Sequence, residues 1–180
     1  MKRIEQKVED TWCLEDMFES DDFWEEEFGR LQRMIFQYED FEGTLGESAD
    51  RLLEYLKFND ETNLLMERLY VYANMRYHQD MANSMYQEFA ARAQKLMVEM
   101  SGASAFAEPE ILEITTEKIN VFFNENPELE TYKRYISERQ TATHSGRGVT
   151  TESLSCGRAY RFHGELTAKV RRIASVISGF

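Results

Sequence analysis

The stretch between Glu61 and Phe106 constrains the fold more than any other part of the sequence. Its apolar residues recur at steps of three and four, the spacing that lines one face of an α-helix. The first series comprises Leu65, Leu69, Tyr72 and Met75 or Arg76, and the second comprises Ala82, Met85 or Tyr86, Phe89, Ala93, Leu96 and Met100. Any core of this protein must therefore be built against these two faces.

A helix boundary is predicted between the two series. Ser84 and Gln87 have the spacing of a capping box, in which two side chains satisfy the first free N–H groups of a helix. We therefore predict two helices, at about 61–80 and 84–101, that fold back as an antiparallel hairpin. One continuous helix through this region is the alternative.

Two further helices are predicted before the hairpin. Ser20 is a suitable N-cap for a helix with a core-facing stripe, and Ser48 can cap a short helix that ends in a turn at Asn59 and Asp60. The stripe after Ser20 consists of Trp24, Phe28, Leu31, Ile35 and Tyr38.

After the hairpin, Pro109 predicts a break, because proline disfavours the α conformation of the preceding residue. Thr115 or Thr116 can then cap a short helix, and Asn126 followed by Pro127 is a typical helix start. With only two Pro in 180 residues, the sequence predicts an all-α bundle of about six helices around the hairpin.

Charge excludes several classes of partner. The net charge of −12 argues against nucleic acid, which requires a concentrated basic face, and against an anionic membrane surface. No apolar run approaches the roughly 18 residues of a membrane span, and the first residues do not form a signal peptide. Cys13 and Cys156 are too few for a disulfide framework. We expect a cytoplasmic protein with reduced thiols.

The charge changes sign near residue 139, which predicts two regions. Residues 1–138 carry 14 Lys and Arg against 31 Asp and Glu, whereas residues 139–180 carry 7 against 2. The second region also holds five of the nine Gly and ten Ser or Thr, and its pattern has no helical period except for a weak basic helix at 166–177. We predict a helical domain over 1–138 and a poorly ordered tail over 139–180.

From Trp12 to Ile136 the sequence resembles the N-terminal region of the oligoendopeptidase F family, zinc metallopeptidases of the thimet-oligopeptidase-like superfamily. The matching pieces follow one another in the order found in the family. They are Trp12-x-Leu14-Glu15-Asp16-Met17-Phe18, Leu45-Gly46-Glu47-Ser48, Leu69-Tyr70-Val71-Tyr72-Ala73-x-Met75-Arg76-Tyr77, Asn83-Ser84-x-Tyr86-Gln87, Ala91-Arg92-Ala93, Ser101 to Phe106, Pro109-Glu110-Ile111-Leu112, Pro127-Glu128-Leu129 and Tyr132-Lys133-Arg134-Tyr135.

The resemblance implies a helical wall of a peptide-binding channel without the catalytic centre. Members of the family hydrolyse oligopeptides with a zinc ion held by the two His of a His-Glu-x-x-His helix and by a later Glu. His78, His144 and His163 fit no such spacing. No catalytic residue, metal ligand or cofactor is therefore assigned to this chain, and we expect it to be inactive alone.

Four residues in the first helix of the hairpin are candidates for lining a substrate groove: Tyr72, Arg76, Tyr77 and His78. Phenol and guanidinium groups at this spacing can hydrogen-bond a peptide backbone, and the resemblance supports that role. Aromatic residues at helical spacing also pack in cores, and a lone His near a helix end also serves as a cap or surface residue. Both alternatives remain open.

The resemblance ends near Glu138, which suggests a frameshift. Codon degeneracy allows another reading frame across Thr141 to Gly148 to encode Arg, Ile, Leu, Ala and Glu residues that suit the family. The expected partners are an oligopeptide, and either the missing catalytic domain or a second copy at the surface that would face that domain. The alternatives are a free-standing acidic helical bundle that binds a protein or peptide, and an acidic mimic of nucleic acid.

Overall fold

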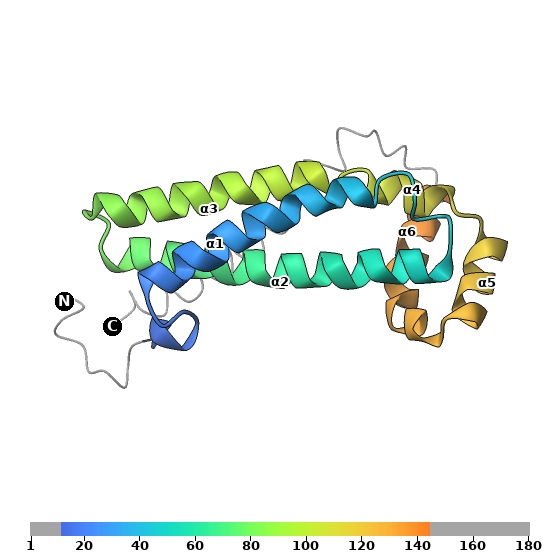
Figure 1. Cartoon of the computed structure of the whole chain (residues 1–180), viewed down its shortest axis with the longest axis horizontal. Coiled ribbons are helices and arrows are strands. Elements are labelled where there is room, and N and C mark those ends of the chain that lie inside the picture. The colour runs from blue at the N-terminus through green and yellow to red at the C-terminus, as the bar shows by residue number, and fades with distance from the viewer. Residues whose placement is uncertain (1–11, 145–180) are drawn as a thin grey trace. The chain divides into compact units, whose positions relative to one another are not determined.

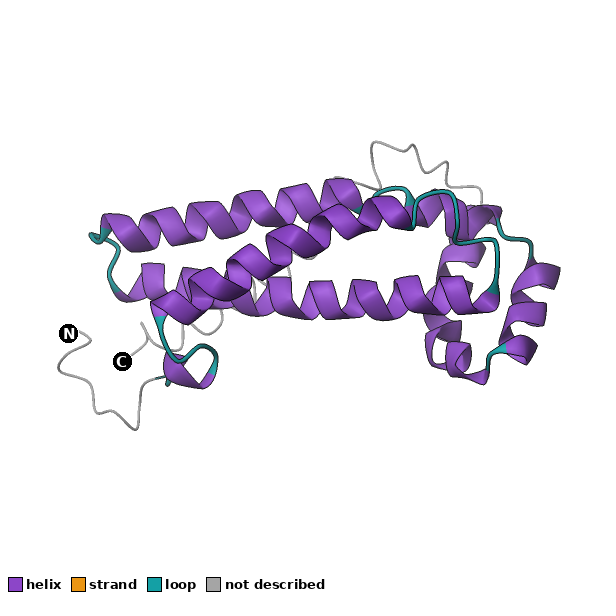
Figure 2. Ribbon diagram, viewed as in Figure 1, coloured by secondary structure: helices purple, strands orange, loops and turns teal. Residues whose placement is uncertain are grey.

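The structure is a computed structural model that describes residues 12–144, with side chains described as far as residue 140. The chain divides into two compact units, Met1–Tyr132 and Lys133–Phe180. Figure 2 shows only helices and loops in the described residues, so the predicted all-α class is confirmed for them.

Three long helices form the body of the first unit. They are α1 (Asp21–Phe36), α2 (Ala49–Gln79) and α3 (Ser84–Ala103), and they lie side by side in Figure 1. A short turn between α2 and α3 reverses the chain, so the predicted antiparallel hairpin is confirmed and one continuous helix is excluded. Helix α1 packs against both members of the hairpin.

Aromatic side chains form the centre of this three-helix layer. The Trp24 ring is fully buried and stacks on Phe89, with 4.3 Å between ring centroids, and on Phe28 at 5.0 Å. Its indole N–H donates to the Leu69 carbonyl at 3.0 Å. The Arg92 guanidinium lies 4.5 Å from the centroid of the Phe28 ring. These contacts join α1, α2 and α3, as the apolar stripes predicted.

Most of the predicted helix starts are confirmed. The side chains of Ser20, Ser48 and Thr115 each accept a hydrogen bond from the backbone N–H three residues later, which is N-cap geometry. The predicted cap at Ser84 is wrong by one residue, because the Asn83 side chain accepts from the Met85 N–H. Gln87 donates to the Met81 carbonyl and does not complete a capping box.

Helix α2 is continuous across Asn59 and Asp60, so the predicted turn there is wrong. The Asn59 side-chain carbonyl accepts from the Tyr38 hydroxyl at 3.1 Å, and the Asp60 carboxylate accepts from the Tyr132 hydroxyl at 2.8 Å. These side chains are therefore not available to compete with the helix for its backbone N–H groups, which is how Asn and Asp favour turns. Tertiary contacts override the local preference.

Pro109 does not break a helix but lies in the first turn of α4 (Ala107–Glu113). The first four N–H groups of a helix have no intrahelical acceptor, so a proline there removes no hydrogen bond. The chain does break just before α4, after Ala103. The predicted helix at Pro127 is instead a 3-10 helix, η5 (Pro127–Tyr132), whose entry is capped by the Asn126 side chain.

Helix α5 (Thr116–Glu125) and η5 pack against α2. The Asn126 amide donates to the Asp50 carboxylate at 2.7 Å, and Lys57 forms an ion pair with Glu128. Two short 3-10 helices flank α1 in the described part of the unit, η3 (Leu14–Asp16) before it and η4 (Gln37–Asp40) directly after it.

The described part of the second unit is one helix, α6 (Lys133–His144). Arg134 and Glu138 form an ion pair one turn apart, and the Arg139 guanidinium lies over the Tyr135 ring. Helical structure therefore continues past residue 139 as far as His144. The remainder of the predicted tail, residues 145–180, lies outside the described residues.

Candidate functional site

The four predicted groove residues lie near the C-terminal end of α2, but on different faces. The Tyr72 side chain is fully buried, and 19% of the Arg76 side chain is exposed. Tyr77 is half-buried and His78 is exposed, with 5.1 Å between their ring centroids. Residues four apart on a helix share a face, so Tyr72 meets Arg76 while Tyr77 and His78 point elsewhere.

Tyr72 and Arg76 belong to a polar cluster with Asp21 of α1 and Tyr86 of α3, which we call the Asp21 cluster. The Tyr72 hydroxyl donates to Asp21 Oδ1 at 2.7 Å and accepts from Arg76 Nε and Nη2 at 3.1 and 3.0 Å. Arg76 Nε also lies 3.3 Å from Asp21 Oδ1, and the Tyr86 hydroxyl donates to Asp21 Oδ2 at 3.4 Å. The cluster joins one end of all three long helices.

Local sequence places each member of the cluster. Asp21 is the first residue of α1, directly after the Ser20 cap, where an acidic side chain complements the helix dipole. Tyr86 lies in the first turn of α3. Sequence reasoning identified Tyr72 and Arg76 but missed Asp21 as their partner. The available signal was an acidic first turn in a helix whose stripe had to pack on α2.

The electrostatics of the cluster favour protonated phenols. The pKa of the Tyr72 hydroxyl is raised to about 12, first by burial and then by its hydrogen bond to Asp21. Burial and the Asp21 charge also raise the pKa of Tyr86. Burial lowers the pKa of Arg76, but its contacts with Tyr72 and Asp21 outweigh that effect and the net shift is upward. At neutral pH the cluster is therefore a fixed set of donors around one carboxylate, suited to holding helices together.

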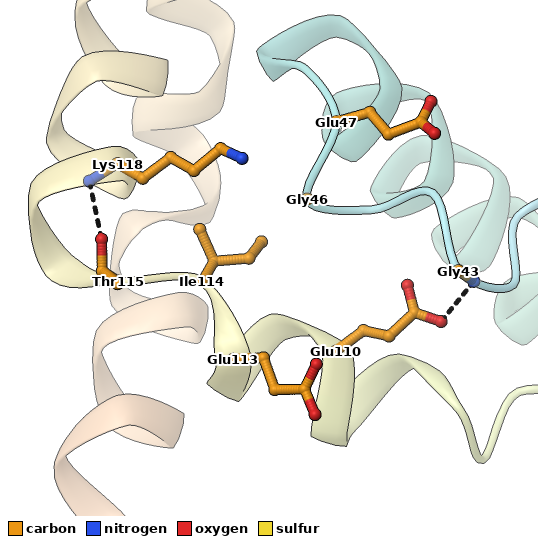
Figure 3. A pocket seen from close by; sticks show the side chains of 8 residues that line it. All are labelled: Gly43, Gly46, Glu47, Glu110, Glu113, Ile114, Thr115 and Lys118. Carbon is orange, nitrogen blue, oxygen red and sulfur yellow. Dashed lines mark hydrogen bonds between the residues drawn. The ribbon is translucent and has the colours of Figure 1, made fainter.

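A second feature is an open hollow of about 520 Å³ bordered by the loop that precedes α2, by α4 and by the start of α5 (Figure 3). The Glu110 carboxylate lies at one side and accepts backbone hydrogen bonds from Gly43 at 2.6 Å and Leu45 at 3.3 Å. Gly43 has a φ of 78°, which is accessible mainly to glycine. The hollow is lined by Gly43, Gly46, Glu47, Glu110, Glu113, Ile114, Thr115 and Lys118.

The described residues contain no group of three His, Cys, Asp or Glu side chains arranged to hold a metal ion. The zinc ion implied by the resemblance therefore has no fitting ligand set in this part of the chain. Within the same residues, no helix is long and apolar enough to cross a membrane.

Curated relatives of this chain are bacterial oligopeptidases. The chain is 41% identical over 136 residues to oligopeptidase PepF of Bacillus subtilis, a match that covers 76% of this chain and 20% of that protein. It is 33% identical over 135 residues to group B oligopeptidase PepB of Streptococcus agalactiae, covering 75% and 22%. No family model matches the chain.

A solved structure agrees with these relatives. Oligoendopeptidase-F from Enterococcus faecium superimposes with a TM-score of 0.66 and 31% sequence identity, covering 78% of this chain and 28% of that one. The chain thus spans about a fifth of the length of the curated relatives it matches. Sequence and structure agree that about three quarters of this chain is homologous to part of oligoendopeptidase F, a part that amounts to 20–28% of the longer proteins.

Proposed function

We propose that this chain is the N-terminal helical part of an oligoendopeptidase F-like zinc peptidase and forms one wall of its oligopeptide channel. The observation that carries the proposal is the match in both sequence and backbone to oligoendopeptidase-F over 78% of this chain but only 28% of the longer one. Hydrolysis belongs to the remainder of such a protein, since this sequence has no His-Glu-x-x-His segment. The chain alone is inactive.

Within this wall we assign two roles to the four groove candidates. Tyr77 and His78 have exposed surface and supply the contacts to peptide. Tyr72 is fully buried and hydrogen-bonded to Asp21, so it acts with Arg76 by fixing the end of α2 from which the other two project. Substitution of Tyr77 or His78 should therefore affect substrate binding, whereas substitution of Tyr72 or Arg76 should affect stability.

A chimera tests this proposal. Residues of this chain replace the matching segment of Bacillus subtilis oligopeptidase PepF, and cleavage of a quenched fluorogenic oligopeptide is measured. We expect the chimera to cleave the peptide, Tyr77→Ala and His78→Ala to raise KM severalfold, and Arg76→Met to lower Tm with KM unchanged. Zinc-dependent cleavage by the isolated chain, or an unchanged KM in both alanine variants, would contradict the proposal.

A second candidate is an acidic helical module that binds a basic protein or peptide independently of a peptidase. The excess of 31 Asp and Glu over 14 Lys and Arg in residues 1–138 favours it. The encoding DNA distinguishes the two candidates. The first requires another frame beyond codon 139 that continues the family pattern to a His-Glu-x-x-His segment. The second is supported if neither alternative frame does so.

The first candidate also implies a surface that normally faces the rest of the peptidase. Without that partner, exposed apolar side chains favour self-association. Trp12, Phe36, Leu64 and Val98 are all more than half exposed, with Phe36 at 71%. Sedimentation at increasing concentration tests this: dimers or larger species are expected, and a monomer at all concentrations would argue for the independent module.

A further inference from the structure

We infer that the turn between α2 and α3 is a reversible oxidation site, where Met81 and Met85 take up oxygen from a peroxide and become methionine sulfoxides. The inference does not depend on the proposed function, because it concerns only the exposure and the chemistry of this turn. It rests on two exposed thioethers at one end of the three-helix layer (Figure 1), set against four methionines that are buried in the core.

Exposure separates the methionines of the described residues into three groups. Met81 and Met85 are 58% and 43% exposed. Met17 and Met75 are half-buried. Oxidation requires the peroxide to reach the sulfur, so the reaction should be fastest in the first group and slowest in the buried one. The buried group, in which no residue is more than 8% exposed, consists of Met34, Met66, Met97 and Met100.

The start of α3 is held by hydrogen bonds that involve neither sulfur of the exposed pair. The Asn83 side chain caps the helix by accepting from the Met85 N–H at 3.0 Å. The Gln87 side chain donates to the Met81 carbonyl at 2.8 Å. In both bonds the methionine contributes a main-chain atom, so adding an oxygen to its sulfur breaks neither contact. The turn therefore keeps its hydrogen bonds in the oxidised protein.

The reaction is a transfer of one oxygen atom and two electrons. A lone pair of the thioether sulfur attacks one oxygen of hydrogen peroxide, the O–O bond breaks, and the other oxygen takes up the proton of the first and leaves as water. The sulfur is oxidised and the peroxide is reduced. A methionine sulfoxide reductase reverses the change with a dithiol, which becomes a disulfide while the sulfoxide oxygen leaves as water.

A sulfoxide is tolerated at this turn but not in the core. Met66 is 2% exposed, and an oxygen added there would have to be buried among apolar side chains, which is costly. At the turn, water can hydrogen-bond to the new oxygens. Met85 also lies in the first turn of α3, where free N–H groups and the helix dipole favour an added acceptor. The hairpin end can therefore consume peroxide without loss of the fold.

Peptide mapping by mass spectrometry tests the site after treatment of the full 180-residue chain with excess hydrogen peroxide. We expect Met81 and Met85 to oxidise at least about tenfold faster than the buried methionines, which react only when the helices open. At that stage Tm should change by no more than about 3 °C. A methionine sulfoxide reductase with dithiothreitol should then restore the original mass. Equal rates in the exposed and buried groups, or unfolding with the first sulfoxides, would overturn the inference.

Variants locate the oxygen that is taken up first. Met81→Leu combined with Met85→Leu removes both exposed thioethers at nearly constant side-chain volume. The double variant should lower the early oxygen uptake by one atom for each sulfur removed. Met66→Leu is the matched control, because it removes a buried thioether and should leave the early uptake unchanged. An unchanged early uptake in the double variant, or an equal loss in both variants, would refute the site.

Discussion

Replacing Tyr72 by Phe should change how the stability of the protein depends on alkaline pH. The substitution keeps the buried ring but removes the hydroxyl that donates to Asp21 and accepts from Arg76. At neutral pH the loss of these hydrogen bonds should lower the free energy of unfolding by about 1–3 kcal/mol. Above pH 9, where the tyrosine begins to ionise in the unfolded chain, the difference in stability between the natural protein and the variant should also decrease with pH.

The pKa of Tyr72 gives the sign and size of that consequence. It is about 12 in the folded protein against 10.0 for an ordinary tyrosine. Because the folded-state pKa is raised, the neutral phenol contributes stability that is fully present below pH 10 and lost as the pH rises toward 12. A shift of two units corresponds to about 2.7 kcal/mol, and about half of it, ~1.4 kcal/mol, is lost at pH 11.

Urea denaturation between pH 8 and pH 11 measures this difference directly. The stability advantage of the natural protein over Tyr72→Phe should shrink by about 1.3 kcal/mol between pH 9 and pH 11. Tyr77→Phe is the matched control, since it removes a phenol from the same helix that makes no hydrogen bond within the described residues. If the curves of the natural protein and Tyr72→Phe stay parallel over this range, the assignment of Tyr72 to a buried, Asp21-bonded site is wrong.

Three other substitutions test the packing of the helices. Trp24→Phe removes the N–H that donates to the Leu69 carbonyl and should cost about 1–3 kcal/mol in urea denaturation, whereas an unchanged midpoint would show that the bond contributes nothing. Glu110→Ala should speed hydrogen exchange at the Gly43 amide, with exchange in the α2–α3 hairpin as the internal reference. Thr62→Val removes a buried hydroxyl and should lower the free energy of unfolding by about 1–2 kcal/mol. An unchanged Tm would show that this hydroxyl does not stabilise the fold.

The parts of the fold that follow local rules could be predicted from the sequence. Ser20 and Ser48 cap helices as expected, because an N-cap needs only its own side chain and the next three residues. The hairpin was also predictable, since two long stripes of helical period must pack on each other when few other apolar faces exist. The prediction failed by one residue at Ser84, where Asn83 offers an equally good acceptor.

The errors share a cause, which is contact between residues far apart in sequence. The local sequence at Asn59 and Asp60 predicts a turn. In the structure their side chains accept hydrogen bonds from Tyr38 and Tyr132, and the helix continues. The surroundings of Tyr72 could not be predicted for the same reason. The position of Tyr72 in the helical pattern fits a surface residue as well as a core residue. Only the contact with Asp21, 51 residues earlier, shows that its hydroxyl faces inward. No local pattern in a single sequence contains that information.

Helix α2 is held along its length by polar contacts as well as by apolar packing, and this has a consequence for function. Apolar stripes alone permit neighbouring helices to slip by a turn, because each turn presents similar groups. Trp24 of α1 donates to the Leu69 carbonyl, and Asp21 of α1 accepts from Tyr72 near the end of α2. Tyr38 of η4, directly after α1, lies 2.6 Å from the Thr62 hydroxyl near the middle of α2. The segment formed by α1 and η4 is therefore fixed to α2 at three successive levels. Slippage would break all three contacts and leave the buried Trp24 N–H without its acceptor, which costs more than a misfitted methyl group. The end of α2 from which Tyr77 and His78 project is therefore set by the register of α1, and any role of these residues in binding a peptide depends on it.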